Sequence, residues 1–361
     1  MIKMKKILTI IGARPQFIKA ASFSKNLQEC PEIKEIIVHT GQHYDSNMSE
    51  IFFNELNIPK PKYNLNINNG THGEQTGRML IELEKIIIKE KPDYVLVYGD
   101  TNSTLAGALV GSKLHIPIIH IEAGCRSFDR KMPEEINRIC TDNVSNFLFC
   151  VTSKEVELLE KEGITKNVFV VGDLMFDTIK LFLEIAERKS KILSSLGLKT
   201  KDYLLATVHR PSNTDNKKNL KNIFDAFIES KKNIVLPIHP RTKKKLIEFK
   251  LWDMYQDKNI IFIKPVSYFD MIVLEKNASK ILTDSGGIQK EAYFFKVPCI
   301  TLRDTSEWVK TIEDGWNVLV HTNKEKILKT IKSFNPQSKQ KNFFGNGDAA
   351  KKIIKIIKNS K

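Results

Sequence analysis

Short apolar runs rich in isoleucine and valine recur along the chain, each bounded by a turn residue and followed by a longer amphipathic stretch. Continuous runs of this kind predict strands that helices cover on both faces, and therefore parallel sheets. In the first half the runs are Ile7–Ile11, Ile36–Thr40, Tyr94–Tyr98, Ile116–Ile121 and Phe147–Val151. In the second half they are Phe169–Val171, Leu204–Val208, Ile234–Ile238, Ile260–Ile263, Lys280–Thr283, Cys299–Leu302 and Asn317–Val320.

About a dozen strands are too many for one comfortable sheet, so we expect an α/β protein of two Rossmann-like, doubly wound domains. The seam is expected near Gly172–Ile185, where a strand gives way to a polar helix. This places a first domain over residues 1–177 and a second over residues 178–345. The helix predicted within residues 346–361 is expected to pack back on the first domain.

Composition narrows the class of protein. The 361 residues include 57 Lys and Arg against 42 Asp and Glu, which gives a formal net charge of +15. Disorder and a disulfide-stapled miniprotein are excluded by the globular composition and the length. The charge favours an anionic partner without choosing among nucleic acid, an acidic membrane surface and a small molecule. The five cysteines include no C-x-x-C pair, so reduced thiols in a cytoplasmic protein are expected.

Other patterns argue against a membrane, a metal site, serine-hydrolase chemistry and nucleic-acid binding. No apolar run approaches the roughly 18–20 residues that span a bilayer, so no membrane partner is expected. The histidines, cysteines and carboxylates lack the tight spacing of a metal site. The G-x-S-x-G signature of serine hydrolases is absent. Nucleic-acid binding would require a recognised module or a basic stripe laced with aromatic residues, and neither is present.

Polar and charged residues follow nearly every predicted strand. In parallel sheets, ligands bind beyond the carboxyl ends of the strands. The His, Arg, Asp and Glu residues gathered there predict a polar, anionic ligand in a cleft between the two domains.

Two of these strand-end segments are suited to phosphate. Asp284-Ser-Gly-Gly-Ile-Gln-Lys-Glu291 joins a strand to a helix, and its glycines let backbone N–H groups approach a diphosphate at the helix N-terminus. Glu291 is placed to accept hydrogen bonds from a ribose. Gly12-Ala-Arg-Pro also opens a helix, and Arg14 and Lys19 supply two cations for phosphate oxygens. No G-x-G-x-x-G follows the first strand, so NAD-type dinucleotide binding is not supported.

Several titratable residues are candidates for acid/base chemistry. Asp100 and Glu122 end neighbouring predicted strands, Glu134 opens a helix, and His209 ends another strand. Each could instead be structural: Asp100 as a turn residue, Glu134 as a helix-start residue favoured by the helix dipole, and His209 as a core histidine. Together with a diphosphate site they suggest proton transfer at a sugar attached to a nucleotide.

The motifs, taken in order, resemble the non-hydrolysing UDP-N-acetylglucosamine 2-epimerases over nearly the whole chain. The matching segments are Gly99-Asp-Thr-Asn-Ser-Thr, His120-Ile-Glu-Ala-Gly-Cys-Arg, Met132-Pro-Glu-Glu-Ile-Asn-Arg, Thr207-Val-His-Arg, His239-Pro-Arg, Thr283-Asp-Ser-Gly-Gly-Ile-Gln-Lys-Glu-Ala and Leu302-Arg-Asp-Thr. The resemblance implies a GT-B-type pair of domains, a homodimer, no cofactor and no metal.

The resemblance also implies roles for individual residues. Acid/base residues of the family match Asp100, Glu122, Glu134 and His209. Nucleotide contacts match Arg14, Lys19, His239, Arg241, Ser285, Gly286, Gly287 and Glu291. The implied reaction interconverts UDP-GlcNAc and UDP-ManNAc for surface polysaccharide: UDP leaves C1, a carboxylate takes the C2 proton, and 2-acetamidoglucal is reprotonated on its other face.

Departures from the common family pattern leave the substrate open. Gln16 stands where Glu is commoner, and Ser306-Glu-Trp-Val309 replaces Thr-Glu-Arg-Pro. Both resemble the branch that acts on UDP-2,3-diacetamido-2,3-dideoxyglucuronic acid, an O-antigen precursor. The sequence also leaves room for a GT-B glycosyltransferase, a hydrolysing epimerase or a nucleotide sensor.

Overall fold

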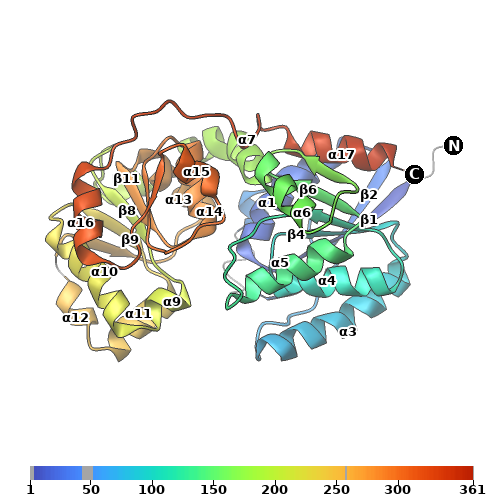
Figure 1. Cartoon of the computed structure of the whole chain (residues 1–361), viewed down its shortest axis with the longest axis horizontal. Helices are drawn as coiled ribbons and strands as arrows, with labels where there is room; N and C mark the ends of the chain where they lie inside the picture. Colours follow the sequence, from blue (N-terminus) through green and yellow to red (C-terminus); the bar gives the residue numbers. More distant parts are fainter. Residues whose placement is uncertain (1–3, 43–51, 257, 361) are drawn as a thin grey trace. The chain divides into compact units, whose positions relative to one another are not determined.

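The computed structural model describes residues 4–42, 52–256 and 258–360, and it divides into two compact units. Met1–Leu181 and Asn342–Lys361 form the first unit, and Phe182–Lys341 forms the second (Figure 1). The second unit is therefore inserted into the chain of the first. The boundaries expected from the sequence, after residues 177 and 345, lie four residues from these.

A seven-stranded sheet with the order β3-β2-β1-β4-β5-β6-β7 forms the centre of the first unit, and all of its neighbouring strands are parallel. Its strands are β1 (Lys5–Ile11), β2 (Ile33–His39), β3 (Tyr63–Asn64), β4 (Tyr94–Tyr98), β5 (Ile118–Ile121), β6 (Phe147–Cys150) and β7 (Val168–Val170). In the register, Leu8 of β1 lies between Ile36 and Val95.

Amphipathic helices cover this sheet. They are α1 (Arg14–Leu27), α3 (His72–Glu90), α4 (Asn102–Lys113), α5 (Pro133–Val144), α6 (Ser153–Lys161), the start of α7 (Leu174–Lys189) and α17 (Ala349–Asn359). One apolar layer joins the sheet to α3 and α4, with Met79, Leu83 and Ala106 among its buried residues. Figure 1 shows α17, the last helix, lying with the first unit, where it packs against α1.

Several hydrogen bonds tie α17 to distant parts of the first unit. The Asp177 carboxylate accepts the Ala350 N–H at 2.8 Å, which satisfies a donor in the first turn of the helix. At the other end, Lys5 Nζ donates to the Ile357 carbonyl at 2.8 Å, where a cation also complements the helix dipole. The Asp173 N–H donates to the Phe344 carbonyl at 3.0 Å, so the returning chain lies beside the outgoing one.

A six-stranded parallel sheet with the order β10-β9-β8-β11-β12-β13 forms the centre of the second unit. Its strands are β8 (Leu204–Thr207), β9 (Ile234–Pro237), β10 (Ile260–Ile263), β11 (Lys280–Thr283), β12 (Cys299–Thr301) and β13 (Asn317–Leu319). Its helices are the end of α7, α8 (Ile192–Ser195), α9 (Pro211–Thr214), α10 (Lys217–Glu229), α11 (Pro240–Glu248), α12 (Trp252–Tyr255), α13 (Tyr268–Asn277), α14 (Gly286–Phe294), α15 (Val309–Glu313) and α16 (Lys324–Ser333).

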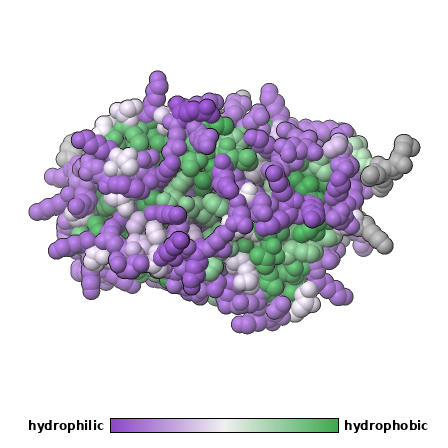
Figure 2. Space-filling view, turned by 90° about the horizontal axis from the view of Figure 1, so that it is seen from above, coloured by the Kyte–Doolittle hydropathy of each residue, from purple (hydrophilic) through white to green (hydrophobic). Residues whose placement is uncertain are grey.

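Both faces of the second sheet are buried. Leu204 and Ala206 of β8 point into a layer with α10, α11 and α16, whereas Leu205 points into a second layer with α13 and α14. This is the doubly wound arrangement that the continuous apolar runs predict, and it confirms the expected α/β fold. The face seen in Figure 2 is largely hydrophilic, in keeping with the many lysines.

Candidate active site

The strand order reverses between β1 and β4 in the first sheet and between β8 and β11 in the second. Such switch points are where open α/β sheets bind ligands. In the first unit, Gly12-Ala-Arg14 follows β1 and Gly99-Asp100 follows β4. In the second unit, His209 lies shortly after β8 and Asp284-Ser-Gly-Gly follows β11. Candidate catalytic or phosphate-binding residues of the sequence analysis therefore lie at each switch point.

Glu122 and Lys19 form a buried ion pair in the first unit. Lys19 Nζ on α1 lies 2.6 Å from Glu122 Oε1, which follows β5, and their side chains are 5% and 12% exposed. The Gly99 turn is packed against the pair: a Cβ added at Gly99 would lie 3.4 Å from Lys19 Nζ and 3.5 Å from Glu122 Oε1. Three segments thus converge on one carboxylate and one ammonium group.

The backbone at Glu122 is in a conformation that few residues with side chains adopt. Its φ is 69°, in the left-handed region, and such positions in a folded protein cluster at functional sites. Two hydrogen bonds hold it there, because the Glu122 and Ala123 N–H groups both donate to the Phe149 carbonyl, at 3.0 and 3.1 Å.

Asp100 is held by a second cation. Arg138 of α5 donates to Asp100 Oδ2 from Nε at 3.1 Å and from Nη2 at 2.6 Å. The same guanidinium donates from Nη1 to Glu135 Oε2 at 2.8 Å. Asn137, one residue earlier, donates to the Asp100 carbonyl at 2.9 Å. The helix therefore positions Asp100 by both its side chain and its backbone.

The two neighbouring glutamates of α5 differ in their surroundings. Glu135 is buried and accepts the N–H groups of Ser127 and Phe128 and the Ser127 hydroxyl, each at 2.9 Å. Burial would raise the pKa of Glu135, but the Ser127 hydrogen bonds and Arg138 outweigh it, and the pKa is lowered. Glu134 is half-buried in the first helical turn. Glu135 is thus a structural anchor, and Glu134 is the more accessible carboxylate.

A buried network lies behind these turns. His120, at 0% exposure, donates from Nε2 to the Gly99 carbonyl at 2.8 Å, and its Nδ1 lies 2.7 Å from Asp142 Oδ1. Asp142 Oδ2 accepts the Gly124 N–H at 3.1 Å and Arg126 Nη1 at 2.7 Å. Burial would raise the pKa of Asp142, but His120 and Arg126 outweigh it, so the pKa is lowered.

His120 and Arg138 lie in segments that match the family, but the sequence analysis assigns no role to them or to Asp142. The sequence does hold one signal for Arg138 and Asp142. Arg138 lies four residues after Glu134 in a helix, and Asp142 follows after four more, so the three share one helix face. His120 points inward from a central strand, and nothing in the sequence shows that its neighbours are polar.

Arg14 is half-buried at the start of α1, with its guanidinium 5.0 Å from the centre of the Phe52 ring. The turn before it is fixed by Gln16, whose Oε1 accepts the Gly12 and Ala13 N–H groups at 2.7 and 3.0 Å. Gln16 Nε2 in turn donates to the Tyr98 carbonyl at 3.0 Å. The amide therefore links the turn that carries Arg14 to the turn that carries Asp100.

In the second unit, Asp284 organises the turn that carries His209. Asp284 is fully buried and accepts the His209 and Arg210 N–H groups and Asn213 Nδ2, each at 3.0 Å from Oδ2. His209 Nδ1 lies 3.4 Å from Asp284 Oδ1, and the side chain is 33% exposed. The backbone is thus fixed while the ring stays accessible, which suits a group that meets a ligand.

His239 follows β9 as the N-cap of α11, and Arg241 is the second residue of that helix. The His239 ring centre is 5.5 Å from that of His209, and its Nδ1 accepts the Arg241 N–H at 3.2 Å. Arg241 donates from Nε to Thr214 Oγ1 at 3.0 Å and pairs with Asp215. Burial acts to raise the pKa of Asp215, but Arg241 outweighs it and the pKa is lowered. The structure brings the two histidines together, and it directs Arg241 toward Asp215.

Ser285 and the two glycines begin α14, as the sequence predicts. The Ser285 N–H donates to Thr283 Oγ1 at 2.9 Å. A Cβ added at Gly286 would lie 3.5 Å from Trp308 Nε1, so the indole borders the turn. Glu291, further along α14, is buried at 4% exposure.

The segment 306–309, whose sequence departs from the common family pattern, therefore lies beside the phosphate-binding candidate. Glu307 forms two hydrogen bonds with Arg303, at 2.9 and 3.1 Å. Lys290 Nζ lies 4.0 Å from the centre of the Trp308 ring.

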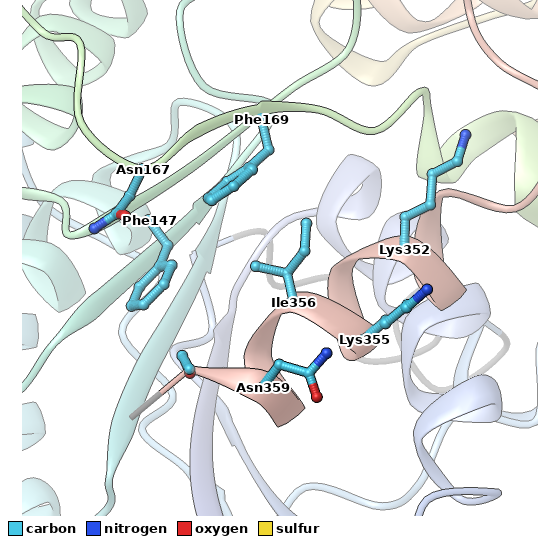
Figure 3. A pocket seen from close by; sticks show the side chains of 8 residues that line it. Phe147, Asn167, Phe169, Lys352, Lys355, Ile356 and Asn359 are labelled. Atoms are coloured by element: carbon cyan, nitrogen blue, oxygen red, sulfur yellow. The ribbon is translucent and has the colours of Figure 1, made fainter.

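A hollow of about 640 Å³ lies elsewhere in the first unit. Figure 3 shows Phe147, Phe169 and Ile356 lining it, with Lys352 and Lys355 of α17. Phe147 begins β6, whereas Asp100 and Glu122 lie beyond the ends of their strands, so the hollow is away from the candidate carboxylates.

Within residues 4–42, 52–256 and 258–360, no three His, Cys, Asp or Glu side chains are grouped as a metal site would require. Over the same ranges, no helix combines the length and the apolar character needed to traverse a bilayer.

The fold and sites define a class of enzyme, the sugar-nucleotide epimerases, which are isomerases. A family model described as UDP-N-acetylglucosamine 2-epimerase matches residues 25–358. The chain belongs to this family, which confirms the resemblance seen in its motifs.

Relatives match the chain along almost its whole length. A UDP-N-acetylglucosamine 2-epimerase homolog of Methanococcus maripaludis is 57% identical, over 98% of this chain and 99% of the relative. A UDP-2,3-diacetamido-2,3-dideoxy-D-glucuronate 2-epimerase of Pseudomonas aeruginosa is 49% identical, over 98% and 99%. The crystal structure of Methanocaldococcus jannaschii UDP-GlcNAc 2-epimerase in complex with UDP-GlcNAc and UDP is 50% identical, covers 98% of this chain and 100% of its own, and has a TM-score of 0.93. The two units are thus GT-B-like.

Proposed function

We propose that the chain interconverts UDP-N-acetylglucosamine and UDP-N-acetylmannosamine. The observation that carries the proposal is the pair of carboxylates beside one switch point, Asp100 and Glu122, each 2.6 Å from a cation. Carboxylates positioned by cations in this way are suited to accept a proton from carbon. The relatives named as UDP-N-acetylglucosamine 2-epimerases support the choice of sugar.

The chemistry explains why proton transfer and the nucleotide belong to one reaction. The C2–H of the sugar is not beside a carbonyl, so direct deprotonation would be very slow. When the C1–O bond breaks, its electron pair leaves with UDP and positive charge develops at C1. A carboxylate then takes the C2 proton, and the C–H electrons form the C1=C2 double bond of 2-acetamidoglucal. Protonation on the opposite face and return of the UDP oxygen to C1 complete the inversion.

We assign the proton transfers to Asp100, Glu122 and Glu134 of the first unit and His209 of the second. The residues proposed to hold UDP and stabilise its departing charge are Arg14, His239, Arg241, Ser285, Gly286, Gly287 and Glu291. Backbone N–H groups at the start of α14 provide the dipole that favours a diphosphate. The first unit thus supplies most of the proton-transfer groups, and the second supplies most of the nucleotide contacts.

The test is incubation with UDP-GlcNAc in deuterated water, followed by proton NMR and chromatography. The proposal requires UDP-ManNAc to appear and deuterium to enter C2 of both sugars. Inversion without deuterium would contradict the mechanism, and release of free ManNAc and UDP would identify a hydrolysing epimerase instead. UDP release that depends on an added acceptor would identify a glycosyltransferase, and unchanged substrate would favour a nucleotide sensor.

A second substrate is favoured by two observations. The Pseudomonas aeruginosa relative at 49% identity is named for UDP-2,3-diacetamido-2,3-dideoxy-D-glucuronate, and Trp308 borders the Ser285-Gly-Gly turn. The same assay with this sugar separates the candidates. Turnover of the diacetamido sugar with none of UDP-GlcNAc would assign the chain to the narrower branch.

We also propose a cytoplasmic homodimer that supplies surface polysaccharide synthesis. Light scattering after size exclusion tests the dimer, because a mass near 41.4 kDa would show a monomer.

A further inference from the structure

Lys19 lies deeper in the first unit than the other candidate phosphate ligand of its helix. It follows Arg14 by five residues, which is roughly 7.5 Å along the helix axis. Arg14 is half-buried at the start of α1, whereas the Lys19 side chain is only 5% exposed. A buried ammonium group is costly unless it is paired and hydrogen-bonded, so its partner indicates what it is for.

The partner of Lys19 is a candidate acid/base residue. Its Nζ donates to Glu122 Oε1 at 2.6 Å, a short charge-assisted hydrogen bond. Gly99 has φ 63° and no side chain, which leaves its turn in contact distance of both atoms. Glu122 itself has φ 69°. Two left-handed positions therefore shape the space in which the pair sits.

Several other charged groups of this region have partners of their own. His120, Arg126 and Asp142 form the network behind the turn. Glu155 of α6, beneath Gly124, accepts the Thr152 N–H and hydroxyl at 2.7 and 2.6 Å. Asp100 is held by Arg138. Lys19 is a cation that the structure places on the Glu122 carboxylate.

We propose that Lys19 is a positioning residue that acts through Glu122 by holding and aiming this carboxylate, and that it is not a diphosphate ligand. This departs from the nucleotide role that the family resemblance implies for Lys19. It rests on the proposed function, because the carboxylate is assigned to proton transfer at the sugar. An ammonium ion at this distance favours the charged carboxylate over the neutral acid.

The test compares Lys19→Met with Lys25→Met, a variant of an exposed lysine on the same helix. UDP binding is measured by calorimetry, and turnover is measured as UDP-ManNAc formed. For Lys19→Met we expect the Kd for UDP within about twofold of the parent and kcat lower by ~10²-fold or more, the usual scale for acid/base catalysis. The acidic limb of the kcat–pH profile should move to higher pH. Lys25→Met should match the parent in the Kd for UDP, in kcat and in the acidic limb of the pH profile.

Two results would overturn the proposal. One is a Kd for UDP weakened tenfold or more in Lys19→Met while kcat at saturation is unchanged, as expected for a diphosphate ligand. The other is an unmoved pH limb. Lys19→Arg keeps the charge, so its kcat should be at least tenfold higher than that of Lys19→Met. If Lys19→Met does not fold, Lys19→Arg takes its place in the test. The tenfold limit on weakening of the Kd for UDP then applies to Lys19→Arg.

A further measurement does not depend on turnover. Melting temperatures of Lys19→Met, Glu122→Gln and the double variant should be non-additive, with the double variant less destabilised than the sum of the single changes. If the parent turns over neither sugar, the proposed function fails. The Kd for UDP and the melting temperatures of these variants would still show whether Lys19 pairs with Glu122 or binds the diphosphate. Additive shifts would contradict the pairing.

Discussion

Replacement of Asp142 by asparagine tests whether the buried network holds the first unit together. Asp142 and His120 are both fully buried, and Asp142 Oδ2 lies 2.7 Å from Arg126 Nη1. Removing one partner of a buried ion pair costs about 3–5 kcal/mol, because the remaining charge is uncompensated. Arg126 keeps Glu162, at 2.6 Å, so we expect the lower end, about 3 kcal/mol. For a unit of this size the loss corresponds to roughly 6–12 °C in Tm.

The assay exploits the distribution of tryptophan. Trp252, Trp308 and Trp316 all lie in the second unit, so their fluorescence follows that unit while far-UV circular dichroism follows both. Asp142→Asn should lower the midpoint temperature of the dichroism transition and leave that of the fluorescence transition unchanged. Glu82→Gln is the control, because its partner Lys85 is 65% exposed and surface pairs contribute about 0–1 kcal/mol.

The pH dependence follows from the lowered pKa of Asp142. A group whose folded pKa is depressed stabilises the fold above its unfolded pKa, about 3.9, and loses that contribution as the pH falls through the folded pKa. The difference between parent and variant should therefore be equal at pH 7 and pH 5 and should shrink below about pH 4. An unchanged dichroism transition at pH 7 would refute the reasoning.

Three other measurements test the site and the fold. His209→Ala and Glu122→Gln should each lower kcat by ~10²-fold or more while the Kd for UDP stays near the parent value, and full turnover in either would remove that residue from the proton-transfer set. Burial raises the pKa of Asp177 to about 6, so the folded state binds this proton more tightly than the unfolded state. The free energy of unfolding should therefore fall by about 3 kcal/mol as the pH rises from about 4 to about 6. Urea titrations should show this pH dependence in the parent and not in Asp177→Asn. UDP should quench tryptophan fluorescence through Trp308, which borders Gly286, and a quench of equal size in Trp308→Phe would place UDP elsewhere.

The fold could be predicted from the sequence because buried parallel strands have a strong local signal. All twelve apolar runs coincide with strands, whereas β3, only Tyr63–Asn64, has no apolar run and is not predicted by the pattern. Strand order was not predictable, because it depends on contacts between residues far apart in the chain.

The candidate site was predictable in part. The sequence shows which polar residues follow strands β1, β4, β8 and β11, because a polar residue after an apolar run is visible in it. Their partners were not, because Arg138 and Asp142 of α5 reach turns 38 and 18 residues away, at Asp100 and Gly124. Lys19 shows the limit most clearly: its place near Arg14 in the sequence suggests phosphate, and only the structure shows Glu122 beside it.

The insertion of the second unit within the chain of the first sets an order of assembly during synthesis. Phe182–Lys341 is continuous, so it can fold as soon as it leaves the ribosome. The first unit needs α17, which follows the whole second unit in the chain and carries buried Ile353 and Ile357. The surface of α1 that α17 contacts therefore stays uncovered while the second unit is being made. A stop codon placed between the second unit and α17 would release a protein whose second unit is complete and whose first unit lacks its last helix.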